Sequence, residues 1–159
     1  MLIVRIATVD DVPVIRQLIA ELAEYERQPD QVRTTEADIS RDGFGRQPEF
    51  QALIAEWQGA PAGFVIFFSH YSTWRGAGLY LEDLFVRSEF RRRGIATALL
   101  ARVACVAERE KRAFIRWAVL GWNQPAISLY GKLGADFMDE WQTVLLAGGT
   151  LKKLAGHSA

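Results

Sequence analysis

The sequence has very little cysteine and histidine. Its 159 residues include one cysteine, Cys105, and two histidines, His70 and His157. A single cysteine cannot close an intramolecular disulfide, which excludes a disulfide-stapled secreted scaffold. The three residues also lack the spacing of a structural zinc site. We therefore expect no metal, and we interpret both histidines as surface residues and Cys105 as a small packing residue rather than a nucleophile.

The chain also lacks long hydrophobic runs and an excess of charge of either sign. No stretch reaches the roughly 18 apolar residues of a membrane span, and the first residues do not have the order of a signal peptide. Lys plus Arg is 19 and Asp plus Glu is 19, so the formal net charge is 0. A neutral chain has no general affinity for polyanions. We expect a cytoplasmic protein that binds neither a membrane nor a nucleic acid.

The remaining pattern predicts alternating strands and helices. Half of the residues are hydrophobic, and the length suits a single domain over residues 1–159 with a short polar tail from about residue 150. The expected strands are 2–6, 50–57, 63–69, 79–86, 113–120 and 141–146, and the expected helices are 12–22, 34–39, 94–109 and 125–133. This order predicts an α/β (α+β) fold with one mixed sheet and helices on both faces.

Two adjacent carboxylates, Glu82 and Asp83, interrupt the otherwise apolar strand at 79–86. Burying an unpaired charge costs free energy, so these acids either pair with arginines such as Arg5 or Arg116 or serve a site. Neighbouring residues of a regular strand point to opposite faces, so the two acids could not share one pocket. A β-bulge at this point would re-aim one of them and leave backbone N–H groups free for a ligand.

A basic turn with glycine follows this strand and precedes a helix. The segment is Arg91-Arg92-Arg93-Gly94-Ile95-Ala96-Thr97. A helix that begins here presents unpaired N–H groups and the positive end of its dipole, and Gly94 has no Cβ to hold an anion away from the backbone. The turn suits a pyrophosphate cradle or an ordinary solvated helix start. It matches neither the dinucleotide motif G-x-G-x-x-G nor the P-loop motif.

The last long predicted helix carries two polar residues on one face. Asn123 and Tyr130 are seven positions apart, so at about 100° per residue they return to within ~20° of each other. Asn123 also suits a helix N-cap, and Tyr130 could fill a core. Taken alone, the pair leaves these alternatives open.

Together these segments resemble the GNAT superfamily of acetyl-CoA-dependent N-acetyltransferases, whose acetyl-CoA signature [RQ]-x-x-G-x-[GA] is matched by Arg91-x-x-Gly94-x-Ala96. Five further blocks resemble the spermidine/spermine and thialysine acetyltransferases: Leu22-Ala23-Glu24-Tyr25-Glu26, 42–45, 79–86, Trp122-Asn123-x-Pro125 and Tyr130-x-x-x-Gly134-Ala135. The likeness covers nearly the whole chain. It implies a twisted, mostly antiparallel sheet of about seven strands, a splayed strand pair that binds acetyl-CoA, and a homodimer.

The resemblance also implies roles for individual residues. It implies that acetyl-CoA, as the acetyl-donor co-substrate, contacts the strand end, the signature turn and the last helix, namely Leu84, Phe85, Val86, Arg91, Arg92, Arg93, Gly94, Ile95, Ala96, Thr97, Asn123, Pro125 and Ala126. It implies that the amine substrate faces Tyr25, Glu26, Glu82, Asp83, Arg116, Trp117 and Ala118. The catalytic residues would be Tyr130 and Glu82.

The chemistry of these residue types agrees with those roles. An alkyl ammonium with a pKa near 10.4 must lose a proton before it attacks a thioester, and a carboxylate can attract it and accept that proton, directly or through water. The N–H of Leu84 or Phe85 could stabilise the oxyanion, and Tyr130 could protonate the departing thiolate. Gly121 stands where relatives often have an acid, which disfavours long polyamines.

We therefore predict direct acetyl transfer, within a ternary complex, to the primary amine of a small cationic metabolite. Polyamines, diamines and lysine analogues such as thialysine are the expected acceptors. Two alternatives remain at this stage: acetylation of a protein or peptide amine, and a non-catalytic module that only binds acyl-CoA.

Overall fold

The computed structural model describes residues 1–157 of the chain. These residues divide into two units, one from Met1 to Leu120 and one that begins at Gly121. The expectation of a single domain over residues 1–159 stays a prediction. Within the described residues, no helix combines the length and the apolar character that crossing a membrane requires.

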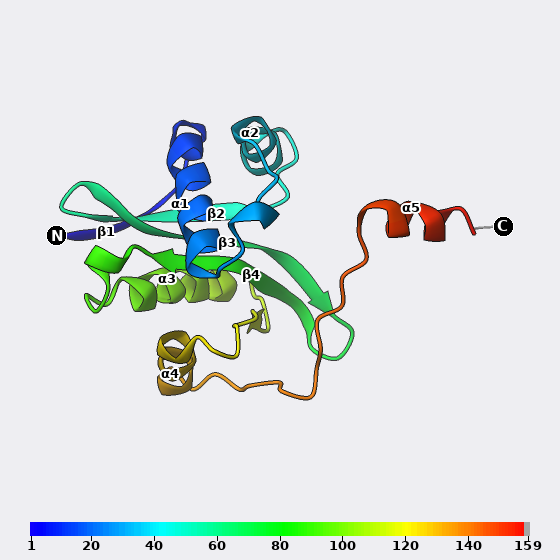
Figure 1. Cartoon of the computed structure of the whole chain (residues 1–159). Coiled ribbons are helices and arrows are strands. Elements are labelled where there is room, and N and C mark those ends of the chain that lie inside the picture. Colours follow the sequence, from blue (N-terminus) through cyan, green and yellow to red (C-terminus); the bar gives the residue numbers. More distant parts are fainter. Residues whose placement is uncertain (158–159) are drawn as a thin grey trace. The chain divides into compact units, whose positions relative to one another are not determined.

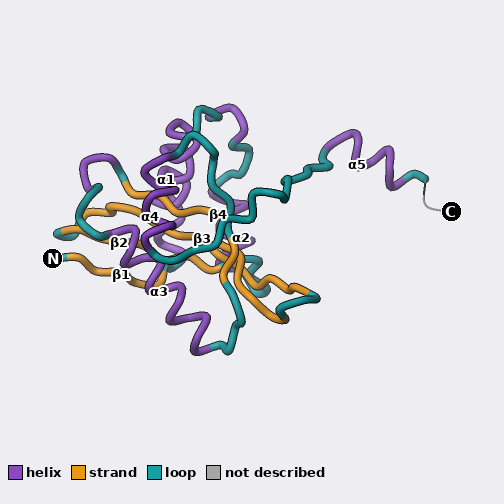
Figure 2. Tube along the Cα trace, turned by 90° about the horizontal axis from the view of Figure 1, so that it is seen from below, coloured by secondary structure: helices purple, strands orange, loops and turns teal. Residues whose placement is uncertain are grey.

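The first unit contains the whole sheet (Figure 1). Its strands are β1 (Leu2–Ile6), β2 (Gln51–Trp57), β3 (Ala60–Ser72), β4 (Gly76–Val86) and β5 (Ile115–Arg116). They lie in the order β1-β2-β3-β4-β5, and all neighbours are antiparallel except β4 and β5, which are parallel. Figure 2 shows β3 and β4 running side by side as the long central hairpin of this sheet. A mixed, mostly antiparallel sheet is therefore confirmed.

Helices cover both faces of the sheet, as the sequence predicts (Figure 1). One face packs against α1 (Val12–Tyr25) and α2 (Glu36–Phe44), and the other against α3 (Ile95–Arg109). Side chains alternate along β3, so Phe64 and Ile66 enter the core beneath α1 and α2, whereas Val65 and Phe67 are buried on the α3 side. Three short 3-10 turns, η1 (Val9–Asp11), η2 (Pro29–Gln31) and η3 (Ser88–Phe90), complete the unit.

Ion pairs fix the end of α1 to the sheet. Arg87, the residue after β4, donates two hydrogen bonds of 2.8 Å to Glu21 of α1 and one of 2.9 Å to the carbonyl of Pro61. At the other end of α1, the Arg5 guanidinium beside Asp11 lowers the pKa of that carboxyl to about 2. Asp11 also accepts the N–H of Thr8 at 2.7 Å, which is the capping box that their spacing predicts.

Two expected strands differ in the structure, which has five strands rather than about seven. The nearly continuous apolar character of residues 113–120 predicts a strand buried on both faces. Only Ile115 and Arg116 of this stretch pair with β4, and they are half-buried. The strand expected at 141–146 does not form, and Trp141, Val144 and Leu145 are exposed. A strand is stabilised by pairing with a neighbour, and the described residues supply none for this segment.

Smaller differences concern helix ends and exposure. The turn-forming residues 42–45 predict an end to the helix expected at 34–39, but α2 continues through Asp42 and Gly43 and stops at Gly45. Cys105 is exposed on α3, so its interpretation as a packing residue is wrong. The second unit contains α4 (Gln124–Lys132), close to the predicted 125–133, and α5 (Gly148–Ala155), where we expected only a polar tail.

Candidate active site

A β-bulge lies in β4 at the two adjacent carboxylates. Ile66 of β3 pairs with Asp83, and the next residue, Phe67, pairs with Leu81. Glu82 is therefore the extra residue of the bulge and has no partner on β3. The bulge predicted from the sequence is present.

The bulge turns both carboxylates to the same face of the sheet. Asp83 stands opposite Ile66, which belongs to the core beneath α1 and α2, so Asp83 faces that side. The ring of Tyr80 stacks on that of Phe68, whose side chain points to the same face as Ile66. Glu82 is two positions after Tyr80, so regular alternation from Tyr80 places the Glu82 side chain on this face as well. In a regular strand the two adjacent acids would have pointed to opposite faces. The extra residue removes that obstacle to a shared site.

Glu26 joins Glu82 and Asp83 to form an acidic cluster. It directly follows α1 as the C-cap residue, and Tyr25 precedes it. Burial, followed by the negative charges of Glu82 and Glu26, raises the pKa of Asp83 to about 7. Burial and the charge of Glu82 also raise the pKa of Glu26. The cluster therefore attracts a cation and can hold a proton near neutral pH.

Arginines do not neutralise this cluster. Arg5, one of the partners considered from the sequence, is engaged by Asp11 and Glu56 at 2.7 and 2.8 Å. The ion pairs found among residues 1–157 include neither Arg116 nor any acid of the cluster. The structural alternative, in which the two acids only balance arginines, therefore fails. In the same part of the chain, no grouping of side chains has the composition of a metal site.

Beyond Tyr80, the edge of β4 that faces β5 is open. The parallel pairing consists of Leu79 with Ile115 and Tyr80 with Arg116, and within the described residues it goes no further. Trp117 and Ala118 follow Arg116 outside any strand. The bulge two residues after Tyr80 twists β4 away from its neighbour, which gives a physical reason for the short β5. This is the splayed strand pair that the resemblance implies.

The backbone groups of the open edge follow from the alternation of a strand. Arg87 donates its N–H to Ala62 of β3 at 2.9 Å, so its amide faces inward. Because the direction of the backbone groups alternates along a strand, the N–H and C=O of Phe85 also face β3. Those of Leu84 and Val86 face outward. Of the two candidate oxyanion donors, Leu84 and Phe85, the geometry thus favours Leu84.

The signature turn begins α3 in the expected conformation. Gly94 is the N-cap with φ 77°, a left-handed conformation that strains other residues, and a Cβ built there meets nothing within 4 Å. Arg92 is also left-handed, at φ 62°. Ile95, Ala96 and Thr97 form the first turn of the helix, where N–H groups lack intrahelical partners. The N-terminal end of α3 therefore offers a positive, sterically open surface for an anion.

The side chain of Arg91 contacts residues of the first unit. Its Nε donates to the carbonyl of Val86 at 3.0 Å, and its guanidinium lies 4.6 Å from the ring centre of Tyr25. The rings of Tyr25 and Phe85 are 6.4 Å apart. Arg93 instead lies over Trp57, 5.1 Å from that ring's centre. Tyr25 is thus held between the strand end and the signature turn.

The remaining predicted residues lie in the second unit. Asn123 is the N-cap of α4, and its side chain accepts the N–H of Ala126 at 3.4 Å, as a helix-capping asparagine does. Pro125 occupies the first turn, where its missing N–H costs nothing. Tyr130 lies seven positions after Asn123, within the same helix.

Sequence analysis missed a set of aromatic side chains beside the acidic cluster. Phe68 and Tyr80 stack at 5.4 Å between ring centres, and His70 lies 5.6 Å from Tyr80 and 5.8 Å from Phe114. His70 is half-buried in this set, so its interpretation as a plain surface residue is wrong. The alternating apolar residues of β3 were the available signal for this set. The bulge shifts the register, so the sequence alone does not show which residues of β4 lie opposite them.

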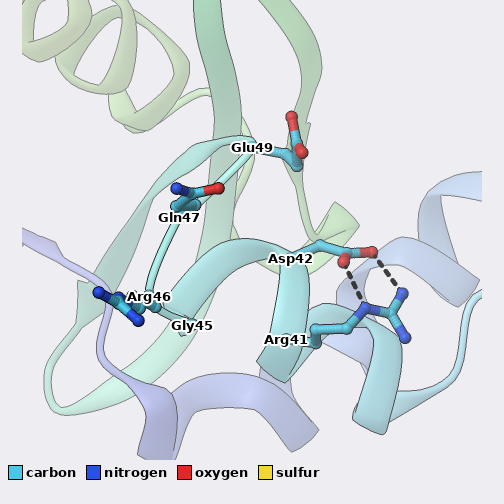
Figure 3. Close-up of a pocket in the computed structure, with 6 residues that line it drawn as sticks. All are labelled: Arg41, Asp42, Gly45, Arg46, Gln47 and Glu49. Carbon is cyan, nitrogen blue, oxygen red and sulfur yellow. Dashed lines mark hydrogen bonds and ion pairs between the residues drawn. The ribbon is translucent and has the colours of Figure 1, made fainter.

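A surface pocket lies away from these residues. It has a volume of about 470 Å³ and is lined by residues at the end of α2 and in the loop that follows, Arg41, Asp42, Gly45, Arg46, Gln47 and Glu49 (Figure 3). Arg41 is already paired with Asp38 and Asp42 at 3.0 and 2.7 Å. None of the predicted site residues lines this pocket, so it plays no part in the candidate site.

The raised pKa of Asp83 predicts a pH-dependent stability. Its pKa falls from about 7 in the folded state towards 3.8 on unfolding, so the folded state binds the proton more tightly. The free energy of unfolding should therefore decrease by about 2–3 kcal/mol, from this group, between pH 5 and pH 8. Urea unfolding at both pH values should show a smaller decrease for Asp83→Asn. Asp30→Asn, an exposed control, should behave as the wild type; equal slopes for all three proteins would contradict the prediction.

Comparison with known proteins identifies a family that shares these features. The sequence profile described as "Acetyltransferase (GNAT) family" matches residues 13–135. The chain is 39% identical over 153 residues to a thialysine N-epsilon-acetyltransferase of Bos taurus, covering 89% of this chain and 90% of that protein. It is 37% identical over 139 residues to the spermidine/spermine N(1)-acetyltransferase-like protein 1 of Homo sapiens, covering 83% of this chain and 20% of that one.

Solved structures show the same fold at lower sequence identity. An integron cassette protein from the mobile metagenome of V. cholerae superposes with a TM-score of 0.80 at 21% identity, covering 97% of each chain. An aminoglycoside acetyltransferase from an uncultured soil metagenomic sample superposes with a TM-score of 0.76 at 24% identity, covering 92% of this chain and 99% of that one.

Proposed function

Because this chain belongs to the GNAT acetyltransferase family, we propose that it transfers the acetyl group of acetyl-CoA directly to the primary amine of a small cationic metabolite. One observation carries the proposal. The bulge at Glu82 brings two carboxylates to one face of β4, beside an open strand edge that leads to the N-terminus of α3. Family membership makes the chain an N-acetyltransferase; the acceptor class and the ternary complex are our proposal.

The residues present fit acetyl-CoA as the co-substrate. The outward N–H and C=O groups of Leu84 and the outward N–H of Val86 could pair with the amide-containing pantetheine arm as an added strand does; the carbonyl of Val86 already accepts the Nε–H of Arg91. The first turn of α3, behind Gly94, offers amides and open space to a pyrophosphate. Asn123 and the start of α4 are assigned to the remainder of the arm on the family likeness. When bound, acetyl-CoA supplies an activated acyl carbon.

The acidic cluster prepares the amine. Glu26, Glu82 and Asp83 attract an ammonium group, and Glu82 is the exposed member, at the bulge itself. We assign Glu82 as the base that accepts the ammonium proton, directly or through water. Asp83 stays largely protonated below pH 7 because its pKa is raised to about 7, which limits the total negative charge at the site. Removing that proton frees the lone pair of the nitrogen for attack.

Two further groups serve the later steps. The N–H of Leu84 points out of the sheet and can donate to the carbonyl oxygen as negative charge builds there. Tyr130 is assigned as the acid that protonates the thiolate leaving group, whose reference pKa is about 8.5. With an amine as the direct nucleophile, no acetylated residue is required, which agrees with the exposed Cys105 lying on α3 rather than in the acidic cluster.

An acceptor panel tests the proposal. Release of CoA should be measured with acetyl-CoA and thialysine, lysine, ornithine, 1,5-diaminopentane, spermidine, an aminoglycoside and a lysine-containing peptide. We expect turnover with at least one small amine and less with the peptide. Tight binding of acetyl-CoA without any turnover would instead indicate a non-catalytic module. Turnover with the peptide alone would assign the activity to protein or peptide amines.

Substitution of Gly94 tests the proposed phosphate cradle. Gly94→Ala should cost about 1 kcal/mol of stability, because an L-residue is strained at φ 77°. It should also weaken acetyl-CoA binding by about tenfold, since the new methyl group projects towards the anion site. Calorimetric titration and urea unfolding measure the two effects.

The chain provides a matched control for this substitution. Gly59, in the hairpin between β2 and β3, has φ 84° and equally open space around its Cβ position. Gly59→Ala should lose similar stability and keep the affinity for acetyl-CoA. If both variants bound acetyl-CoA like the wild type, the cradle would have to lie elsewhere.

We propose a cytoplasmic homodimer as the working state. The second unit supports the dimer, because it exposes large apolar side chains over a short stretch: Phe137, Met138, Trp141, Val144, Leu145, Leu146, Leu151 and Leu154. Contiguous exposed apolar residues favour a protein interface. Sedimentation velocity would detect the dimer, and fractionation of the host cell would give the location.

A further inference from the structure

A row of aromatic side chains extends from the acidic cluster along the same face of the sheet. The aromatic row consists of Phe68, His70, Tyr80 and Phe114, with neighbouring ring centres 5.4 to 5.8 Å apart. Tyr80 lies at the end nearer the bulge, and burial, followed by the charge of Glu82, raises its pKa. The row therefore begins where the acids end.

Gly78 creates the space for the last ring of the row. A Cβ at position 78 would clash with the ring of Phe114, so only glycine allows that ring to lie against β4 here. Gly78 also stands opposite His70 in the β3–β4 pairing, which explains why the two rings meet edge to face. The position of the Phe114 ring therefore depends on the glycine at position 78 of β4.

Arg116 lies on this platform without an anionic partner. Its guanidinium is 5.3 Å from the ring centre of Phe114, which is within cation–π range. It is half-buried, and no carboxylate among residues 1–157 is within ion-pair distance of it. Arg5, Arg41, Arg87 and Arg112, by contrast, are all paired.

Arg116 is near the acids but separate from them. Burial and the charge of Glu82 raise the pKa of Tyr80, and the charge of Arg116, its partner in the parallel pairing of β4 with β5, opposes that rise. The pKa of Asp83 is raised by burial and by the charges of Glu82 and Glu26. One face of the sheet therefore carries a negative pole at the bulge and a positive pole at Arg116, and Tyr80 lies between the two.

We infer that Arg116, held on the ring of Phe114, is a specificity-determining residue that binds an anionic group of the acceptor. This inference rests on the proposed function. The acceptor then carries an amine at one end, for the acidic cluster, and a carboxylate at the other. In a diamine of equal length, the second ammonium group has no carboxylate beside it and would meet the positive guanidinium alone, so the diamine is disfavoured. The aromatic row contacts the methylenes between the two ends.

Two acceptors that differ in one group test this inference. Lysine and 1,5-diaminopentane share the reacting amine and the methylene chain, and lysine alone has a carboxylate. We expect the wild type to prefer lysine in kcat/KM, and Arg116→Gln to reduce that preference by about 10- to 100-fold, the usual effect of a charge-assisted hydrogen bond. Arg116→Lys should restore part of it. Pentylamine, which has neither a carboxylate nor a second ammonium group, should react equally with the wild type and Arg116→Gln.

Two further variants distinguish loss of the positive charge at Arg116 from a general effect on the structure. Arg112→Gln removes a nearby arginine that is paired with Glu110 and Ser69, and it should keep the lysine preference. Phe114→Leu removes the platform and should reduce the preference while circular dichroism shows an intact fold. If Arg116→Gln retains the full lysine preference, the inference is wrong.

A binding measurement distinguishes failure of this inference from failure of the proposed function. If no amine is acetylated, the proposed function fails, and saturation-transfer NMR with lysine and 1,5-diaminopentane then decides the role of Arg116. A stronger lysine signal in the wild type that is lost in Arg116→Gln supports the inference. Equal signals from both ligands, or an unchanged lysine preference in the variant, overturn it.

Discussion

Replacing Tyr130 by phenylalanine is expected to lower kcat by about 100-fold or more, the usual contribution of a positioned proton donor. Acetyl-CoA binding should change by less than about threefold, because the phenyl ring keeps the shape and loses only the hydroxyl. The thiolate of CoA is a poorer leaving group when it departs unprotonated. Steady-state rates with a saturating amine, together with calorimetric titration of acetyl-CoA, measure the two effects separately.

The pattern of these two measurements identifies the role of Tyr130. A phenol that only packed or bound the cofactor arm would change affinity and leave kcat nearly unaltered. Tyr71, which is 71% exposed on β3, provides the control, since Tyr71→Phe removes the same hydroxyl at an ordinary surface position. If Tyr130→Phe keeps wild-type kcat, the general acid must be another group, and the assignment made from the family likeness is withdrawn.

The sequence predicts the bulge because the bulge resolves a conflict in the sequence. Two charges cannot both enter the apolar core of a regular strand, and arginine pairing was the alternative. In the structure, Arg5 forms ion pairs with Asp11 and Glu56, and Glu82 has no partner in the pairing of β3 with β4. Local violations of patterning are often located at functional sites, and here the violation coincides with the bulge and the acidic cluster.

The failures concern elements that depend on distant partners. The stretch at 141–146 has the composition of a strand, yet a strand requires a neighbour, and composition does not say which one it finds. The short β5 has the same origin, since the bulge in β4 ends its pairing after Arg116. The aromatic row was hidden for a related reason, because Gly78 and Phe114 come together only once β4 and β5 are in register.

Local signals were more reliable. The Gly94 helix start, the capping box at Thr8 and the N-cap at Asn123 all lie where their sequences indicate. Each depends on residues within four positions of one another, so it does not require a distant partner to form. What the sequence could not supply was the outward direction of the Leu84 amide, which follows from the register of β4 against β3.

Two changes at position 82 should both lower kcat strongly and affect the fold differently. Glu82→Gln removes the assigned base and keeps the bulge, and we expect kcat at pH 7 to fall by about 100- to 10 000-fold. The loss should shrink at higher pH, where more of the amine is already deprotonated. Glu89→Gln, an exposed acid of η3, is the control and should retain wild-type rates.

Deletion of Glu82 tests the bulge itself. Leu81 already pairs with Phe67 and Asp83 with Ile66, so removing the extra residue joins two segments of β4 without shifting either register. The side chains on both faces keep their directions, and the thermal midpoint should be equal to or above that of the wild type. Activity should be lost as in Glu82→Gln, since the carboxylate is gone. A stable deletion variant with wild-type kcat would move the role of base to Asp83, whereas one that unfolds would show that the bulge is required by the sheet rather than by the reaction.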